Sequence, residues 1–101
     1  MPRSLKRPTP EELAALDQWE IDPSGQTISR SLCFDDFTDA FAFMTRVALL
    51  AERLDHHPDW HNVYKQLDIR LSTHDVGGLT TLDLQMAQAI DRWFAQYRLG
   101  R

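Results

Sequence analysis

The sequence predicts an α+β fold, a small antiparallel sheet of about four strands with three helices packed on one face. Segments with helix-start signals and helical periodicity are interspersed with segments whose apolar residues alternate with a period of two. No βαβ unit repeats along the chain, which favours antiparallel over parallel pairing. Because such a sheet is small, we expect its edge strands to pair with another copy of the chain.

The first predicted helix runs from about Pro10 to Trp19. Thr9 is a suitable N-cap, proline suits the first helical position, and Glu12 can complete a capping box. A β-hairpin follows, with its turn at 23–26 and its arms at 19–22 and 27–34. In the second arm, alternation predicts one shared face for three apolar residues, Ile28, Leu32 and Phe34.

The central helix is predicted from an aspartate cap at 35 or 36 to about Leu54. Phe43 and Leu50 lie beyond the edge of its apolar stripe, so we expect this helix to bury a second side against another subunit. Pro58 prevents the helix from continuing, because proline interrupts the hydrogen-bond ladder. The expected core-facing stripe comprises Phe37, Phe41, Met44, Val47, Ala48, Ala51 and Leu54.

One long strand is predicted from Val63 to Thr73, with alternate residues facing the core. A turn at Gly77-Gly78 leads to a second capping box formed by Thr80 and Asp83. The last helix then runs to about Arg98, and its stripe comprises Leu82, Met86, Ile90, Trp93 and Tyr97.

The length, charge and cysteine content of the chain limit the classes of protein to which it can belong. The 101 residues suit a single domain at 9–101, preceded by a basic arm at 1–8 that we expect to be mobile. The 15 acidic and 11 basic residues leave a net charge of −4, which disfavours a nucleic-acid partner. The sequence has neither a secretory signal nor an apolar run long enough to cross a membrane, so we expect no membrane association and a cytoplasmic protein. Cys33 is the single cysteine and cannot form an internal disulfide.

The four histidines, His56, His57, His61 and His74, fall within one part of the chain. The first pair follows a predicted helix and the last ends a predicted strand, and such ends hold functional side chains on rigid elements. Histidine can donate and accept protons near neutral pH, so this cluster suits general acid–base catalysis. Trp60 could stack on a flat ligand.

Other interpretations of these residues stay open. The loop histidines could be solvated, Trp60 could belong to the core, and Glu52 could face solvent. Asp83 could serve only its helix cap. A zinc site would use three histidines and a carboxylate, but no cysteine pair or His-Glu-x-x-His helix supports it, and two adjacent histidines do not easily turn to one metal.

The residues between Phe34 and Trp93 resemble the pterin-4a-carbinolamine dehydratase family. The match lies in several blocks in the same order and at the same separation. They are Phe41-Ala42-Phe43-Met44-Thr45-Arg46-Val47-Ala48, Leu54-Asp55-His56-His57-Pro58-Asp59-Trp60, Asn62-Val63-Tyr64, Leu71-Ser72-Thr73-His74, Gly78-Leu79-Thr80 and Asp83.

The resemblance implies a lyase that removes water from 4a-hydroxytetrahydrobiopterin or a related pterin and yields quinonoid dihydropterin. This activity recycles tetrahydrobiopterin for aromatic amino-acid hydroxylases, above all phenylalanine hydroxylase. It also implies no metal and no organic cofactor, since the pterin is the substrate, and a homodimer or homotetramer. A non-catalytic alternative is an interaction module, a dimerisation cofactor or transcriptional coactivator like the animal members that bind a homeodomain transcription factor.

Carried onto this chain, the resemblance implies three catalytic histidines, His56, His57 and His74. Proton transfer is assigned to His56 and His74, while His57 holds the pterin. His61 stays outside the site, and Val76-Gly77 departs from the Cys-Ala pair of animal members without removing a site residue. The implied substrate contacts are Glu52, Asp55, His56, His57, Trp60, Ser72, Thr73, His74 and Asp75.

Overall fold

The computed structural model of the chain describes residues 5–100, and residues 1–4 and 101 lie outside it. The four strands form one antiparallel sheet in the order β1-β2-β4-β3. The predicted α+β fold, with three helices and a four-stranded antiparallel sheet, is confirmed. In chain order the elements are α1 (Pro10–Ala14), β1 (Glu20–Ile21), β2 (Ile28–Cys33), α2 (Phe37–Leu54), β3 (Asp59–Val63), β4 (Gln66–Leu71), the short 3₁₀ helix η1 (His74–Val76) and α3 (Thr81–Leu99).

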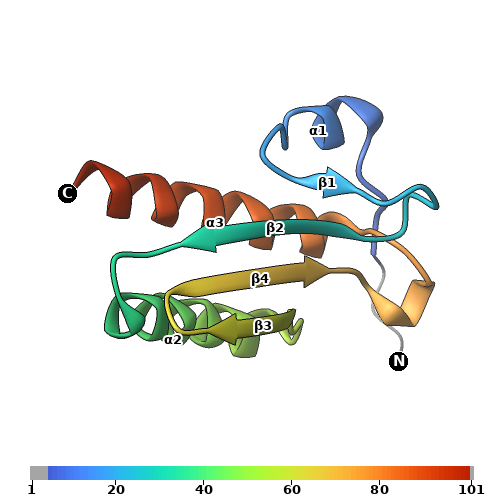
Figure 1. The fold of residues 1–101 in the computed structure, drawn as a ribbon. Helices are drawn as coiled ribbons and strands as arrows, with labels where there is room; N and C mark the ends of the chain where they lie inside the picture. Colours follow the sequence, from blue (N-terminus) through green and yellow to red (C-terminus); the bar gives the residue numbers. More distant parts are fainter. Residues whose placement is uncertain (1–4, 101) are drawn as a thin grey trace.

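Helices α2 and α3 both lie behind the sheet, and α1 lies beside β1 at the sheet's edge (Figure 1). The core fills the space between the sheet and these two long helices. The alternation predicted for β2 is confirmed, since Ile28 and Leu32 are buried while Ser31 and Cys33 are exposed. No helix of residues 5–100 stands in front of the sheet in this view (Figure 1), and the alternate residues Ser31, Asp68 and Arg70 direct polar side chains to that open face.

The first helix is shorter than predicted and ends at Ala14 instead of Trp19. The capping box of Thr9 and Glu12 forms as expected. Beyond it the chain continues through single turns that bury Leu16 and Trp19 in the core. Tertiary burial of these two side chains therefore overrides the local helical pattern.

The face that α2 turns to the core differs from the predicted one. Phe37 and Phe41 are 47% and 56% exposed, whereas Phe43 and Leu50 are only 7% and 6% exposed. Residues 40, 43, 47, 50 and 51 also recur at helical spacing, so the sequence offers two overlapping stripes, and contact with the sheet selects this one. The basis for a subunit contact at Phe43 and Leu50 was therefore wrong, and the oligomeric state stays a prediction.

The predicted long strand from Val63 to Thr73 was also wrong, because the chain turns back at Tyr64-Lys65. Tyr64 adopts a φ of 53°, and the Asn62 amide donates to the carbonyl oxygens of Tyr64 and Gln66 at 3.1 and 2.9 Å. This turn separates β3 from β4. The local cause of this turn is the Asn62 side chain, which hydrogen-bonds the backbone of the turn. Such a turn leaves no mark in the hydrophobic pattern, so the alternation alone did not indicate it.

The last helix begins as predicted, with Thr80 and Asp83 in a capping box, and it extends to Leu99. Its predicted stripe is only partly buried, because Leu82, Trp93 and Tyr97 are half-exposed while Leu84, Ala87 and Ala89 join the core. Of the predicted N-terminal arm, the described part at 5–8 crosses the η1 loop. There the Lys6 carbonyl oxygen accepts from the Thr81 N–H at 2.9 Å, and Arg7 Nη2 donates to the Val76 carbonyl oxygen at 3.2 Å. The arm's mobility stays a prediction.

Candidate active site

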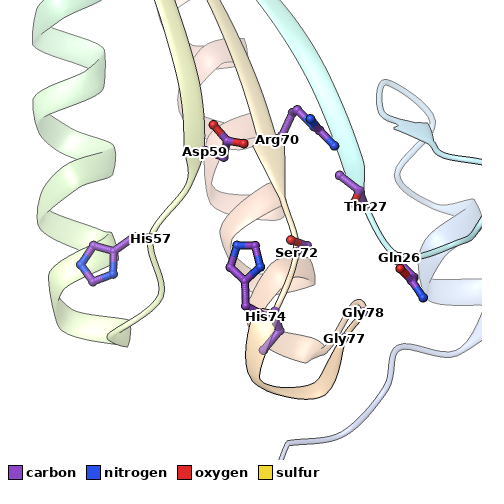
Figure 2. Close-up of a pocket in the computed structure, with 10 residues that line it drawn as sticks. Gln26, Thr27, His57, Asp59, Arg70, Ser72, His74, Gly77 and Gly78 are labelled. Carbon is purple, nitrogen blue, oxygen red and sulfur yellow. The ribbon is translucent and has the colours of Figure 1, made fainter.

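A pocket of about 270 Å³ lies at the end of the sheet where β2 and β3 begin and β4 ends (Figure 2). It opens on the polar face, because alternation directs Asp59, Arg70 and Ser72 away from the helices. Its lining residues are Gln26, Thr27, His57, Asp59, Arg70, Ser72, Thr73, His74, Gly77 and Gly78.

His57 reaches this pocket because α2 ends just before it. Asp55 adopts a left-handed conformation with a φ of 50°, and the His56 N–H closes the last turn by donating to the Ala51 carbonyl oxygen at 3.0 Å. His57 Nε2 donates to Glu52 Oε2 at 2.5 Å. Both side chains are largely exposed, 57% and 76%, so this pair orients an imidazole that stays in contact with solvent.

His74 is placed by a tight loop after β4. Backbone bonds between Thr73 and Gly78 close this loop at 2.8 and 3.3 Å, and Gly77 ends η1 with a φ of 65°. This left-handed conformation favours glycine. The His74 imidazole makes no hydrogen bond with any of residues 5–100, and Figure 2 shows it beside Ser72, across the pocket from His57. The pocket therefore holds two imidazoles that come from different rigid elements.

His56 lies in a different environment, outside the lining of this pocket. It is 5% exposed, and its Nε2 donates to Asp83 Oδ1 at 2.6 Å; Asp83 itself is 1% exposed. The second oxygen of Asp83 accepts from Thr73 Oγ1 at 2.7 Å and from the Thr80 N–H at 2.9 Å. The Thr80 hydroxyl then donates to Thr73 Oγ1 at 2.8 Å. These four residues form what we call the buried polar network: His56, Thr73, Thr80 and Asp83.

The buried polar network ties three elements together, the end of α2, the end of β4 and the start of α3. Every buried side-chain polar atom of the described residues has a hydrogen-bond partner, as a stable interior requires. Asp83 therefore completes the capping box of α3 and also accepts a hydrogen bond from His56. Because Thr73 immediately precedes His74, the network also holds the loop that carries the second pocket histidine.

The structure brings together only part of the predicted site. His57, Ser72, Thr73 and His74 line the pocket, and Glu52 reaches it through its hydrogen bond to His57. Asp55, His56 and Asp75 are outside its lining.

Trp60 lies on the opposite side of the sheet. It pairs with Ile69 across the strands and packs against the core, so its indole faces the helices instead of the pocket. His61, which the sequence left outside the site, lies on the open face beside Asp68 and is not part of the lining.

Several lining residues were missed by sequence reasoning. Arg70 and Asp59 are direct cross-strand partners on the open face. Arg70 lies two residues before Ser72 on the same polar side of the strand. This spacing of two would have predicted that both side chains point to the same face of the sheet. Gln26 and Thr27 come from the β1–β2 turn, and no local signal connects that turn to the histidines.

Among residues 5–100, no group of three or more histidine, cysteine, aspartate or glutamate side chains is arranged to hold a metal ion. Within the same range, no helix combines the length and the apolar character needed to cross a membrane.

The fold and the pocket define a small α+β domain with two imidazoles at one polar pocket, and imidazoles are side chains that can donate and accept protons near neutral pH. A family model described as pterin 4 alpha carbinolamine dehydratase matches residues 5–93, and the chain belongs to this family. The resemblance noted in the sequence is therefore confirmed.

Two relatives, both named "Putative pterin-4-alpha-carbinolamine dehydratase", illustrate the similarity. The chain is 54% identical to the protein of Mesorhizobium japonicum over 82 residues, which are 81% of this chain and 84% of the relative. It is 51% identical to the protein of Bordetella avium over 84 residues, 83% of this chain and 78% of the relative.

A solved structure shares the fold. It is described as the crystal structure of transcriptional coactivator/pterin dehydratase from Brucella melitensis. The TM-score is 0.79 at 44% identity, with 86% of this chain and 97% of that chain covered.

Proposed function

We propose that this chain is a hydro-lyase that removes water from a 4a-hydroxytetrahydropterin and releases the quinonoid dihydropterin. The observation that carries the proposal is the placement of His57 and His74 at one pocket, on two rigid elements, in a member of the pterin carbinolamine dehydratase family. The reaction needs a proton donor and a proton acceptor and no nucleophile, which suits a pair of imidazoles.

The proposed step balances as follows. One imidazolium gives a proton to the 4a-hydroxyl oxygen, the C4a–O bond breaks, and water leaves. The other imidazole takes the proton from the neighbouring ring nitrogen, N5, whose electron pair forms the new N5=C4a double bond. Exchange with solvent then returns each histidine to its starting state, and each transfer contributes on the order of 10²–10⁴-fold.

We assign the two proton transfers to His57 and His74, whereas the sequence assigned them to His56 and His74. The reason is access: His57 is exposed at the pocket, while His56 is buried and its Nε2 is bonded to Asp83. In this proposal His56 is a positioning residue. Its pair with Asp83 supports the loop that carries His74.

In the cell, the quinonoid product would be reduced and reused, so we propose that the chain recycles tetrahydrobiopterin for an aromatic amino-acid hydroxylase such as phenylalanine hydroxylase. The proposal includes a cytoplasmic protein that uses no metal or organic cofactor of its own and acts as a homo-oligomer.

The test is a stopped-flow dehydration assay with synthetic 4a-hydroxytetrahydropterin. We expect His57→Ala and His74→Ala to lose at least 10²-fold in kcat with unchanged thermal stability, because each removes one proton transfer. His61→Ala is the matched control and keeps the full rate. Near-normal rates in either pocket variant would contradict the assignment.

The alternative, a non-catalytic interaction module, is separated by the same assay. The Brucella melitensis relative is described as both coactivator and dehydratase. If the 4a-hydroxypterin loses water no faster with the wild-type chain than without it, the dehydratase proposal fails and the interaction module is the remaining candidate.

A further inference from the structure

We propose that Arg70 is a specificity-determining residue that binds an anionic group, a carboxylate or a phosphate, on the side chain of the substrate. This inference rests on the proposed function, since it names a substrate feature of that same pocket. It concerns a residue outside the histidine motif.

Arg70 is aimed into the pocket by its position in the sheet. It lies on β4 two residues before Ser72, so both side chains are on the open face, and both line the pocket. Figure 2 shows the guanidinium group extending from β4 toward Thr27, away from His57. A flat ring between His57 and His74 would therefore have Arg70 near one of its ends.

No side chain within residues 5–100 bonds the Arg70 guanidinium. Asp59 is its direct cross-strand partner, yet the two form no ion pair. The contrast with Arg30 is informative, because Arg30 Nη1 bonds Asp91 Oδ1 at 2.5 Å and lies over the Phe94 ring. The protein thus uses Arg30 to hold its own structure, whereas the five donors of Arg70 are available to a ligand.

The chemistry of the group selects the ligand. A guanidinium presents parallel N–H donors that match a carboxylate or a phosphate in a bidentate pair. Gln26 and Thr27 line the pocket next to it and add an amide and a hydroxyl. A chain with a net charge of −4 repels free anions, so attraction of an anionic group depends on such a local cation.

The experiment compares three 4a-hydroxytetrahydropterins that differ only in the side chain, which is a neutral diol, a carboxylate or a phosphate ester. We expect the wild type to show a lower KM for at least one of the two anionic substrates than for the diol. Arg70→Gln raises the KM for the preferred anionic substrate about tenfold and raises the KM for the diol much less. The carboxylate and phosphate arms identify which anion is recognised.

Two controls accompany this comparison. Arg70→Lys retains the positive charge but not the parallel N–H donors of the guanidinium, so it should retain only part of the preference for the anionic substrate. Arg53→Gln removes a cation from the exposed end of α2, outside the pocket lining, and should change nothing. Equal KM values for all three substrates in the wild type would overturn the inference. An equal rise for the neutral and anionic substrates in Arg70→Gln would overturn it too, since Arg70 would then bind the ring.

Failure of the proposed function gives a different result. If no pterin is turned over, calorimetric titration with the oxidised neutral and anionic pterins still measures binding. Tighter binding of an anionic pterin that Arg70→Gln abolishes would support the role of Arg70 without catalysis. Binding that is insensitive to charge, or absent, would reject it.

Discussion

His56 and His57 are neighbours in the chain, and each donates Nε2 to a carboxylate, at 2.6 Å to Asp83 and at 2.5 Å to Glu52. The first pair is almost completely buried and the second is more than half exposed. The two hydrogen bonds therefore have similar lengths but contribute differently to the free energy of unfolding. Water screens and replaces the exposed pair, whereas breaking the buried one leaves a polar group without a partner.

The difference also separates two tasks. The buried polar network holds the ends of α2 and β4 and the start of α3 in place, whereas His57, paired with Glu52, lies exposed at the pocket. A rigid second layer beneath an exposed group is how proteins hold reacting side chains in register. Three predictions test this contrast, from the largest effect to the smallest, and a fourth with the smallest effect tests the open face of the sheet.

Asp83→Ala should have the largest effect, a loss of about 3–5 kcal/mol in the free energy of unfolding, because it removes three hydrogen bonds inside the core. Urea denaturation measures it. Asp83→Asn is the matched variant, and it should lose less because one acceptor oxygen remains. A loss below about 1 kcal/mol in Asp83→Ala would mean that the network is not a structural frame.

Alanine at the two adjacent histidines should separate stability from activity. His56→Ala is expected to cost about 3 kcal/mol in unfolding free energy, since Asp83 loses a buried partner, while His57→Ala costs less than about 1 kcal/mol. Differential scanning calorimetry of both variants gives the comparison. Equal losses would show that burial does not distinguish the two pairs.

Glu52→Gln should leave the free energy of unfolding within about 1 kcal/mol of the wild type, because the pair with His57 is exposed. We expect its effect on the dehydration rate to be smaller than that of His57→Ala, since the imidazole itself remains. Urea denaturation and the stopped-flow assay check the two parts. A loss of activity as large as in His57→Ala would make Glu52 a full partner in proton transfer.

Ser31→Ala should have the smallest effect and concerns the open face beyond the pocket. The hydrogen bond from Ser31 Oγ at 2.7 Å is the main cause that lowers the pKa of Asp68, with further contributions from Gln66 and His61. A carboxyl whose folded pKa is lowered stabilises the protein above its unfolded pKa, near 4, and loses this contribution as the pH falls through the folded pKa.

In Ser31→Ala the pKa of Asp68 should rise toward its ordinary value. The variant should therefore be slightly less stable than the wild type at neutral pH, and the difference should shrink below about pH 4. NMR titration of the Asp68 carboxyl measures the shift. An unchanged pKa would assign the lowering to the remaining neighbours.

Local features of the sequence determined the parts of the fold that depend on neighbours along the chain. The caps at Thr9, Asp36 and Thr80 form as expected, and the alternation in β2 gives the expected buried face. The histidine motif also identified the family and two of the pocket's side chains, His57 and His74. A cap or an alternation involves only residues within a turn or a strand, so no distant contact is needed to predict it.

Only the tertiary structure decided which of two α2 stripes faces the sheet, so Phe43 is buried and Phe41 is exposed. It also buried His56 outside the pocket lining and placed His57 in that lining, although the two are adjacent in the sequence. It brought Thr27, which comes from a distant turn, into the same pocket lining as Arg70. The physical reason is common to all three. Burial and pocket formation depend on which surfaces meet across the fold, and spacing along one segment does not contain that information.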